Sequence, residues 1–192
     1  MINPKLKKTR DQVVACQLCS LSKTRTLPVI GQGSHKAKIM FVGEAPGANE
    51  DQTGQPFCGR AGNILGELLE SIGIKREEVY ICNILKCRPP NNRAPLKSEI
   101  DACTPYLYEQ IKSIKPKVIC CLGNFSVRFI MEKFNLQNKI QGISRLRSQM
   151  FNGENEEVGK VKIVPMYHPA VATYNANMKS VLMEDFKVLK DI

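Results

Sequence analysis

The residues of this chain that could carry out chemistry fall into three groups. The first is a glycine-rich loop, residues 43–62, which holds three carboxylates and one aromatic side chain. The second consists of single polar residues, an asparagine and a histidine, at the ends of apolar runs. The third is a set of eight cysteines, which is large for a chain of 192 residues. The residues concerned are Glu44, Glu50, Asp51 and Phe57 in the loop, then Asn83 and His168, and Cys16, Cys19, Cys87 and Cys103 among the thiols.

The elements that must position these groups alternate between strand and helix. Apolar runs predict strands over residues 37–42, 77–85, 116–123 and 160–167, and helical spacing predicts helices over 63–72, 98–114, 125–134 and 179–189. Ser98 is the expected N-cap of the second helix, with Asp101 three residues later, and Gly73 ends the first. The order predicts an α/β fold, a three-layer α/β/α sandwich with a central four-stranded parallel sheet, in a single domain over residues 1–192.

The loop, the asparagine and the histidine should meet at one edge of this sheet. All three lie at the carboxyl ends of different predicted strands, where open α/β sheets hold ligands. The loop could instead only make a turn, but its carboxylates and its aromatic residue favour a ligand site. Phe57 lies beside Pro56 in this loop, which favours a displayed ring over a core ring. Asn83 would cost about 1–3 kcal/mol if buried unpaired, and a polar ligand would remove that cost, although a backbone partner could do the same.

Four cysteines suit a metal centre. Cys16 and Cys19 are two residues apart, and Cys87 and Cys103 can supply a second pair. Four thiolates fit either a tetrahedral zinc or a 4Fe–4S cluster. The wide gap in the second pair is unlike a zinc ribbon and favours iron–sulfur. A redox dithiol at Cys16 and Cys19 would normally follow a strand, and no strand pattern precedes it. The other cysteines, Cys58, Cys82, Cys120 and Cys121, are expected to be small core residues.

Charge favours a polyanionic partner. The formal net charge is +10, which suits nucleic acid, and no amphipathic basic stretch argues for a membrane surface. No apolar run is long enough to cross a bilayer, and the first residues lack the apolar core of a signal peptide. We therefore expect an intracellular, cytoplasmic protein. His35 is expected to be solvent-exposed, and phosphate contacts are expected among Arg88, Arg93, Arg145, Arg147 and Lys179.

Four motifs resemble one family. They are GEAPG at 43–47, PFCGRAG at 56–62, Asn83 with KCRPPNNR at 86–93, and HPA at 168–170. Together with Cys16 and Cys19, they resemble the iron–sulfur uracil-DNA glycosylases called family 4, from about residue 13 to the C-terminus. Cys58 stands where many relatives have valine, and Ala45 stands where the best-known branch of the superfamily has a water-activating aspartate.

The resemblance implies a set of roles. A 4Fe–4S cluster, mainly structural, would be held by Cys16, Cys19, Cys87 and Cys103. Phe57 would stack on uracil, Asn83 would bind its polar edge, His168 would approach O2, and Gly43, Glu44 and Ala45 would line the pocket. His168 and Glu44 are the expected catalytic residues, and Glu50 and Asp51 are alternatives for positioning water or else brace the loop.

The implied activity is hydrolysis of the N-glycosidic bond of a flipped-out uracil in single- or double-stranded DNA. It would leave an abasic site without strand cutting, since no lysine is placed to form a Schiff base. The expected partner is uracil-containing DNA, the expected state is a monomer away from membranes, and binding to a sliding clamp cannot be read from the sequence. Two other readings stay open: a metal-stabilised nucleic-acid-binding module without activity, and a glycosylase that also removes other deaminated bases.

Overall fold

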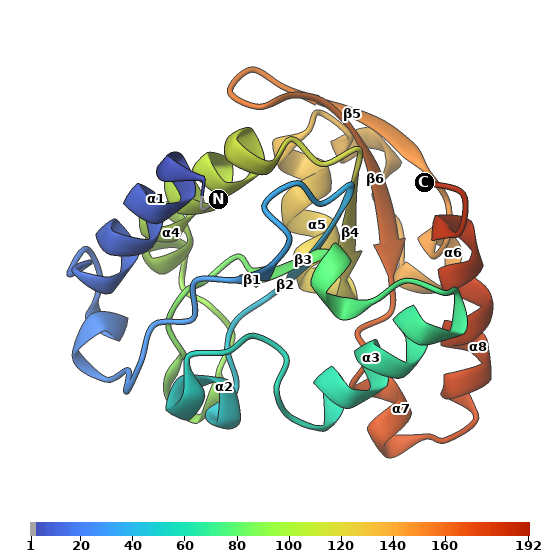
Figure 1. Cartoon of the computed structure of the whole chain (residues 1–192), viewed down its shortest axis with the longest axis horizontal. Helices are drawn as coiled ribbons and strands as arrows, with labels where there is room; N and C mark the ends of the chain where they lie inside the picture. The colour runs from blue at the N-terminus through green and yellow to red at the C-terminus, as the bar shows by residue number, and fades with distance from the viewer. Residues whose placement is uncertain (1–2) are drawn as a thin grey trace.

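The computed structural model describes residues 3–192, in which one six-stranded sheet is covered by helices on both faces (Figure 1). The sheet order is β1-β3-β2-β4-β6-β5; the four central strands are parallel, and the two edge strands pair antiparallel to their neighbours. The strands are β1 (Gln32–Gly33), β2 (Ile39–Gly43), β3 (Tyr80–Asn83), β4 (Val118–Leu122), β5 (Phe151–Asn155) and β6 (Gly159–Met166). The predicted four-stranded parallel sheet is therefore the centre of a larger, mixed sheet.

The helices connect these strands over both faces. They are α1 (Pro4–Val14), α2 (Ala48–Thr53), α3 (Arg60–Ser71), α4 (Lys97–Ile114), α5 (Gly123–Lys133), α6 (Ile143–Leu146), α7 (Val171–Tyr174) and α8 (Met178–Phe186). Five short 3₁₀ turns complete the described elements, η1 (Ser20–Lys23), η2 (Arg76–Glu78), η3 (Pro90–Asn92), η4 (Gln137–Lys139) and η5 (Lys187–Leu189).

Side chains of the central strands alternate between two apolar layers. On β2, Met40 and Val42 pack with α1, α4 and α5, whereas Ile39 and Phe41 pack with α3 and α8. Every residue of β2, β3 and β4 is buried, as expected for parallel strands covered on both sides. The two layers are visible in Figure 1, where α1 and α4 lie side by side and α3 lies with α7 and α8.

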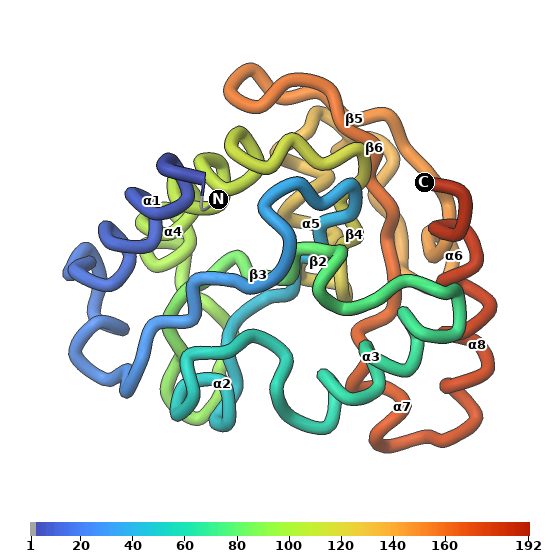
Figure 2. Tube along the Cα trace, viewed as in Figure 1, coloured from blue at the N-terminus to red at the C-terminus, as the bar shows by residue number. Residues whose placement is uncertain are grey.

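The topology places the change of direction of the strand order at β2. The chain passes from β2 to β3 on one side, then returns to β4 on the other side of β2. In open α/β sheets, such a switch in direction leaves a crevice outside the carboxyl ends of the strands. The arrowhead of β6 points toward this edge, where α2, α3 and α7 lie (Figure 1), and the trace in Figure 2 follows the glycine-rich loop along it.

Several predicted boundaries are wrong for local reasons. The helix predicted to begin after Ser98 has Leu96 as its N-cap, because the Glu99 carboxylate accepts a hydrogen bond from the Leu96 amide at 2.8 Å. The glycine-rich loop contains the six-residue helix α2, and α3 begins at Arg60 rather than Asn63. Gly73 does follow the end of α3, with φ of 74° as a left-handed C′ residue requires. The edge strands, α1 and α6 were not predicted.

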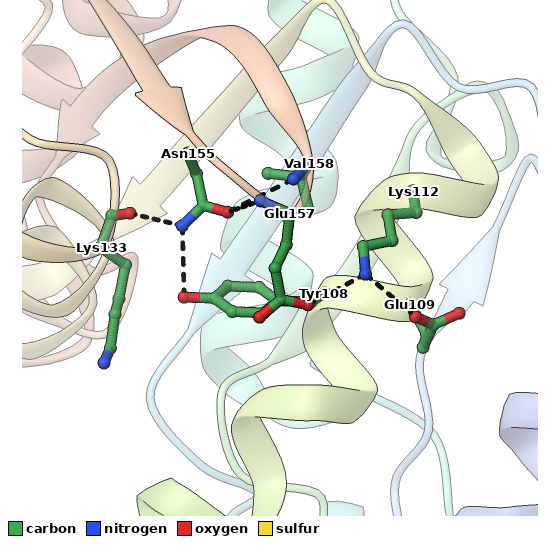
Figure 3. A network of polar contacts seen from close by, with 7 residues as sticks. All are labelled: Tyr108, Glu109, Lys112, Lys133, Asn155, Glu157 and Val158. Atoms are coloured by element: carbon green, nitrogen blue, oxygen red, sulfur yellow. Dashed lines mark hydrogen bonds and ion pairs between the residues drawn. The ribbon is translucent and has the colours of Figure 1, made fainter.

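The antiparallel β5–β6 hairpin is fixed to the helices by a polar network (Figure 3). Asn155 donates to the Lys133 carbonyl oxygen at 2.6 Å and accepts from the Glu157 amide at 2.8 Å. Lys112 of α4 forms ion pairs with Glu157 at 2.9 Å and with Glu109 at 3.2 Å. These contacts hold the edge of the sheet that lies farthest from β1.

Within residues 3–192, no helix is both long enough and apolar enough to span a membrane. Residues 1 and 2, which belong to the predicted domain 1–192 and to the predicted leaderless start, lie outside the described part of the chain.

Candidate active site

Three strand ends bring the predicted site residues to the same edge of the sheet. Gly43 ends β2 and Asn83 ends β3, and the parallel register pairs these two residues directly. His168 lies two residues after Met166, the last residue of β6. Met166 pairs with Leu122, the last residue of β4, so His168 lies at the same edge of the sheet. The geometry therefore brings together residues that are 40 and more positions apart in sequence.

Phe57 reaches this edge from the loop that follows β2. Its ring stacks on the His168 ring, with centroids 5.5 Å apart and planes at 27°. The side chain is only 7% exposed, so the expectation of a displayed ring is wrong. The backbone is also unusual, because φ is +50°, in the left-handed region that bulky residues rarely occupy.

Gly43 is the point where the side chains converge. A Cβ atom built on Gly43 would lie 2.3 Å from Asn83 Oδ1 and 3.0 Å from Phe57 Cζ. Any larger residue would therefore collide with both side chains. Asn83 and Phe57 thus meet at the Gly43 backbone, and His168 joins them by stacking on the Phe57 ring.

The imidazole of His168 has a defined tautomer in this setting. Its Nδ1 atom accepts a hydrogen bond from the Ala170 amide at 3.2 Å, so the proton of the neutral ring lies on Nε2. Burial lowers the pKa of His168 below its ordinary value, and the nearby Glu50 opposes this effect. At neutral pH the ring is therefore uncharged and offers one N–H donor.

Asn83 is buried with its side-chain amide free. Only 2% of the residue is exposed, and among residues 3–192 we find no hydrogen bond to the amide. Its main-chain oxygen accepts from Lys86 Nζ at 2.7 Å, and this ammonium also donates to Gln110 Oε1 at 2.7 Å. Gln110 in turn donates to the Ile30 carbonyl oxygen and to the Tyr80 hydroxyl group. The backbone of Asn83 is thus held from below while its amide faces the site unpaired.

Two of the three loop carboxylates brace the backbone. Glu50 accepts hydrogen bonds from the amides of Gly47 at 3.1 Å and Cys58 at 3.1 Å. Asp51 is 4% exposed and accepts from the Thr26 amide with both oxygens. Glu44 differs, because its half-buried carboxylate has no hydrogen bond or ion pair within residues 3–192. Burial raises the pKa of Glu44 above its ordinary value.

The four predicted ligand cysteines lie near one another, in the region of the apolar cluster against which Ala45 packs. Cys19, Cys87 and Cys103 share an apolar cluster with Ala45, Leu21 and Leu85. Burial raises the pKa of Cys87, and negative charge on Cys19 or Cys16 would raise it further, so both cysteines lie near Cys87. Burial raises the pKa of Cys103 to about 11.

The donor set fits a thiolate-ligated cluster, although the arrangement is not that of a closed site. Arg25 donates to Cys87 Sγ at 3.1 Å and to the Cys16 carbonyl oxygen at 3.2 Å, and Lys86 lies beside Cys87 and Cys103. Two basic side chains therefore lie beside the thiols of Cys87 and Cys103, which suits an anionic centre. Within the described residues, however, no three His, Cys, Asp or Glu side chains are grouped closely enough to hold a metal ion.

Comparison with known proteins identifies the family. The model of the Uracil DNA glycosylase superfamily matches residues 30–188. The chain is similar to the Type-4 uracil-DNA glycosylase of Archaeoglobus fulgidus, with 46% identity over 182 residues that cover 94% of this chain and 89% of the relative. It is similar to the Type-4 uracil-DNA glycosylases of Saccharolobus solfataricus (47% identical, 94% of this chain, 83% of the relative) and Thermotoga maritima (40%, 94% and 90%). The chain belongs to the type-4 uracil-DNA glycosylases. The resemblance that the motifs predicted is confirmed, and with it the enzyme class, a hydrolase of N-glycosyl bonds.

In this type-4 uracil-DNA glycosylase, most predicted phosphate contacts are already engaged. Arg93 forms a 2.6 Å ion pair with the buried Glu99, Arg147 pairs with the buried Asp185, and Lys179 pairs with Glu67 at 2.5 Å. Arg88 donates to Asn92 at 2.8 Å. Arg145 is exposed and has no side-chain partner within residues 3–192.

The predictions for the remaining cysteines and for His35 are confirmed only in part. Cys82, Cys120 and Cys121 are fully buried as predicted, whereas Cys58 is half-buried with its sulfur 3.2 Å from the Thr53 hydroxyl oxygen. His35 is half-buried rather than exposed, because its Nδ1 accepts from the Asn3 amide at 3.3 Å.

The sequence alone did not single out Arg25, Arg76, Lys86 or Gln110. Lys86 and Gln110 form a buried polar pair that no local pattern reveals, because they lie 24 positions apart. Arg25 binds the backbone oxygen of Val14 at the end of α1, and Arg76 binds that of Pro56, 20 positions away. In the sequence, the position of Lys86 directly before the predicted ligand Cys87 was a signal that this lysine supports the cysteine site.

Proposed function

We propose that this chain releases uracil from DNA by hydrolysing the N-glycosidic bond of an extruded nucleotide, in single- or double-stranded DNA, and leaves an abasic site. The observation that carries the proposal is the meeting of Asn83 and Phe57 at Gly43, with His168 stacked on Phe57. An aromatic ring, an amide and an N–H donor gathered at one edge of the sheet match the ring and polar edges of a pyrimidine. A base inside the duplex could not reach such a pocket, so extrusion is part of the proposal.

Recognition of the base rests on Asn83 and Phe57. The Asn83 amide carries both donors and an acceptor, which match O4 and N3–H of uracil. Cytosine presents the opposite pattern at these two atoms and would leave the buried amide mispaired, at a cost of about 1–3 kcal/mol. Stacking of a base on an aromatic ring such as Phe57 contributes about 1–3 kcal/mol more. The backbone of residues 44–47, together with the Glu44 side chain, would close the side where thymine carries its methyl group.

His168 would stabilise the departing base. As the bond to the sugar breaks, negative charge develops on uracil O2, and the Nε2–H of neutral His168 is the donor available to that atom. A preorganised donor of this kind contributes about 3 kcal/mol in the transition state.

Glu44 is the candidate for positioning the attacking water. Glu50 and Asp51 bind backbone amides, which supports the bracing role for them, whereas the carboxylate of Glu44 has no such partner. A carboxylate orients water only when ionised, and burial raises the pKa of Glu44, so its contribution should fade at acidic pH.

We expect base release without strand cutting. Lys86 is the lysine next to Asn83, but it is 1% exposed and its Nζ atom is bound to the Asn83 and Gln110 oxygens. An amine held in this way is not available to attack the sugar.

A 4Fe–4S cluster held by Cys16, Cys19, Cys87 and Cys103 is part of the proposal. The four thiols, their apolar surroundings and the facing cations Arg25 and Lys86 support it. When bound, the cluster would serve as a structural centre that ties the N-terminal segment to α4. Arg25 would support the same junction, since it also donates to the carbonyl oxygen of Val14 at 2.8 Å.

The wider setting follows from charge and fold. A net charge of +10 suits binding to DNA phosphates, with exposed Arg145 as the best placed of the predicted contacts. We further propose that the chain acts as one domain and as a monomer, inside the cell with the DNA.

The decisive experiment compares three oligonucleotides of the same sequence, containing one uracil, one hypoxanthine or no lesion. After incubation with the protein, we expect strand breaks at uracil only when alkali is added. Breaks at hypoxanthine as well would establish a wider range of bases, and breaks before alkali would contradict monofunctional release. Binding without any alkali-sensitive site would favour a module without activity.

A further inference from the structure

We infer that Arg76, which lies 19 positions from the pocket residue Phe57, is a positioning residue that holds the Phe57 ring in place. Arg76 begins the 3₁₀ turn η2, between α3 and β3, and no motif of the chain includes it. The inference deepens the proposed function, because it rests on Phe57 being the residue that stacks on uracil.

Phe57 needs an external hold because its backbone is strained. With φ at +50°, an aromatic residue occupies a region that glycine adopts readily and other residues avoid. Such conformations persist only where the surroundings over-determine them. Phe57 also lies in a loop, between α2 and α3, so no secondary-structure ladder fixes it.

Arg76 supplies this hold from the carbonyl side. Its guanidinium donates to the carbonyl oxygens of Pro56 at 2.7 Å and Phe57 at 3.0 Å, and to that of Gly62 at 3.4 Å. One planar group therefore gathers the two peptide units around the strained residue and the first turn of α3. A fork of donors suits this task, whereas a lysine offers a single point charge.

Glu50 binds the same turn from the amide side. Its carboxylate accepts from Cys58 at 3.1 Å and Gly59 at 3.3 Å. The backbone at Phe57 is thus bound by a cation through its carbonyl oxygens and by an anion through the following amides. Removing either charge should release the turn.

Gly62 completes the arrangement. A Cβ atom at this position would lie 1.7 Å from the Phe57 carbonyl oxygen, so only glycine permits the close approach of α3. With the Phe57 backbone fixed in this way, its ring has little choice but to lie against His168 and Gly43.

No other task is evident for Arg76. It is half-buried, and burial lowers its pKa, yet it forms no ion pair with a carboxylate among residues 3–192. A desolvated cation bound only to carbonyl oxygens is an expensive feature unless those oxygens must be held. The three oxygens belong to the segment that carries Phe57.

The test is a double-mutant cycle on uracil release from a single-uracil oligonucleotide. The variants are Arg76→Met, Phe57→Leu, which keeps apolar volume but removes the flat ring, and their combination. Arg128→Met is the matched control, since Arg128 is an exposed arginine on α5 that pairs with Glu132. Arg76→Lys serves as the conservative variant and as the second variant if Arg76→Met does not fold.

We expect each of Arg76→Met and Phe57→Leu to lower kcat/KM roughly tenfold, the size that lost base stacking supplies. In the Phe57→Leu background, Arg76→Met should change kcat/KM by less than about twofold, because residues that act through one another are not additive. Arg76→Lys should lie between wild type and Arg76→Met, and Arg128→Met should match wild type.

A second readout does not depend on activity. Hydrogen exchange of the amides at 58 and 59 should be faster in Arg76→Met and unchanged in Arg128→Met. Unchanged exchange in Arg76→Met, or equal effects of Arg76→Met in both backgrounds, would overturn the inference while leaving the proposed function intact. If Phe57→Leu has full activity, the stacking role proposed for Phe57 fails instead, and hydrogen exchange still decides whether Arg76 holds the turn.

Discussion

At Asn83 and His168, the surroundings of the side chain decide which hydrogen-bond donors and acceptors it offers to a ligand. Asn83 is buried as a residue, and its side-chain amide makes no hydrogen bond within residues 3–192 but is not among the fully enclosed polar atoms that lack a partner. The Asn83 backbone is held by Lys86. The His168 ring is half-buried and neutral, and the bond from the Ala170 amide to Nδ1 leaves its single N–H on Nε2. In both cases the backbone environment, rather than the residue type alone, defines which donor or acceptor is offered.

The first prediction concerns base discrimination by Asn83. In Asn83→Asp the two N–H donors are lost, so uracil O4 faces an acceptor. We expect the kcat/KM for uracil excision to fall at least about tenfold, since a lost pairing at a buried polar site costs about 1–3 kcal/mol. Excision of cytosine from the matched oligonucleotide should rise from its baseline. Asn138→Asp, at an exposed position, is the control and should behave as wild type.

The second prediction concerns Glu44. Single-turnover excision by Glu44→Ala should be slower than that of wild type by more than roughly tenfold, or about 1.4 kcal/mol. A smaller loss would remove Glu44 from the chemistry and return the role to another group. Glu70→Ala, an exposed carboxylate on α3, controls for the change in charge.

The third prediction concerns His168 and stability. Because burial lowers the pKa of His168 below its ordinary value of 6.5, the unfolded chain binds a proton at this residue before the folded chain does. The associated stability is complete above about pH 6.5 and is lost as pH falls through the lowered pKa. Urea unfolding at about pH 7.5 and pH 5 should show a larger loss for wild type than for His168→Gln. An equal loss in both proteins would show that His168 is not buried in its neutral form.

At the scale of elements, the sheet was largely predictable and its edges were not. The apolar runs at 39–42 and 118–122 can only be central strands, and both are buried throughout. β1 has two residues and β5 carries the polar sequence Phe-Asn-Gly-Glu-Asn, so neither has a strand pattern of its own. Their pairing depends on neighbours that only the folded sheet supplies.

The helix caps show the same limit. Ser98 has the side chain expected of an N-cap, yet Leu96 takes the position, because Glu99 is tied by Arg93 and binds the Leu96 amide. The convergence of the site could be predicted, because it follows from strand ends in a parallel sheet. The buried ring of Phe57 could not, because it depends on the left-handed turn that Arg76 and Glu50 hold.

The fourth prediction concerns the polar pair that joins α4 to β3. In Gln110→Leu, Lys86 Nζ, the Tyr80 hydroxyl group and the Ile30 carbonyl oxygen all lose a partner. We expect the free energy of unfolding to fall by about 1–3 kcal/mol, the cost of leaving buried polar groups unpaired. Urea unfolding measures this change. Gln137→Leu, at an exposed position, should change it by less than about 0.5 kcal/mol.

At the scale of the whole molecule, the thiol cluster and the pocket are neighbours. Ala45 packs against the cysteine cluster, and Asn83 and Cys87 are joined through Lys86. A cluster that orders the cysteines would therefore also order the strand end that carries the amide. Loss of the metal would therefore be expected to disturb the position of Asn83 as well as the cysteines.

The fifth prediction concerns that metal. Protein purified without oxygen should contain iron and sulfide and should absorb near 400 nm, as cysteine-ligated iron–sulfur clusters do. Cys103→Ser should lose most of this absorbance, whereas Cys58→Ser should keep it, because Cys58 lies outside the cysteine cluster. If the protein contains zinc but no iron and does not absorb near 400 nm, the cysteines hold a zinc ion and the prediction of an iron–sulfur cluster is wrong.

The most direct test of the central claim is the amount of free uracil released into solution from DNA that contains it. Wild-type protein should release one uracil per lesion, and the double variant Asn83→Ala/His168→Ala should do so at least about a hundredfold more slowly, since two contacts of roughly 1–3 kcal/mol each are lost. An equal rate for the two proteins, or DNA that keeps all its uracil, would contradict the account.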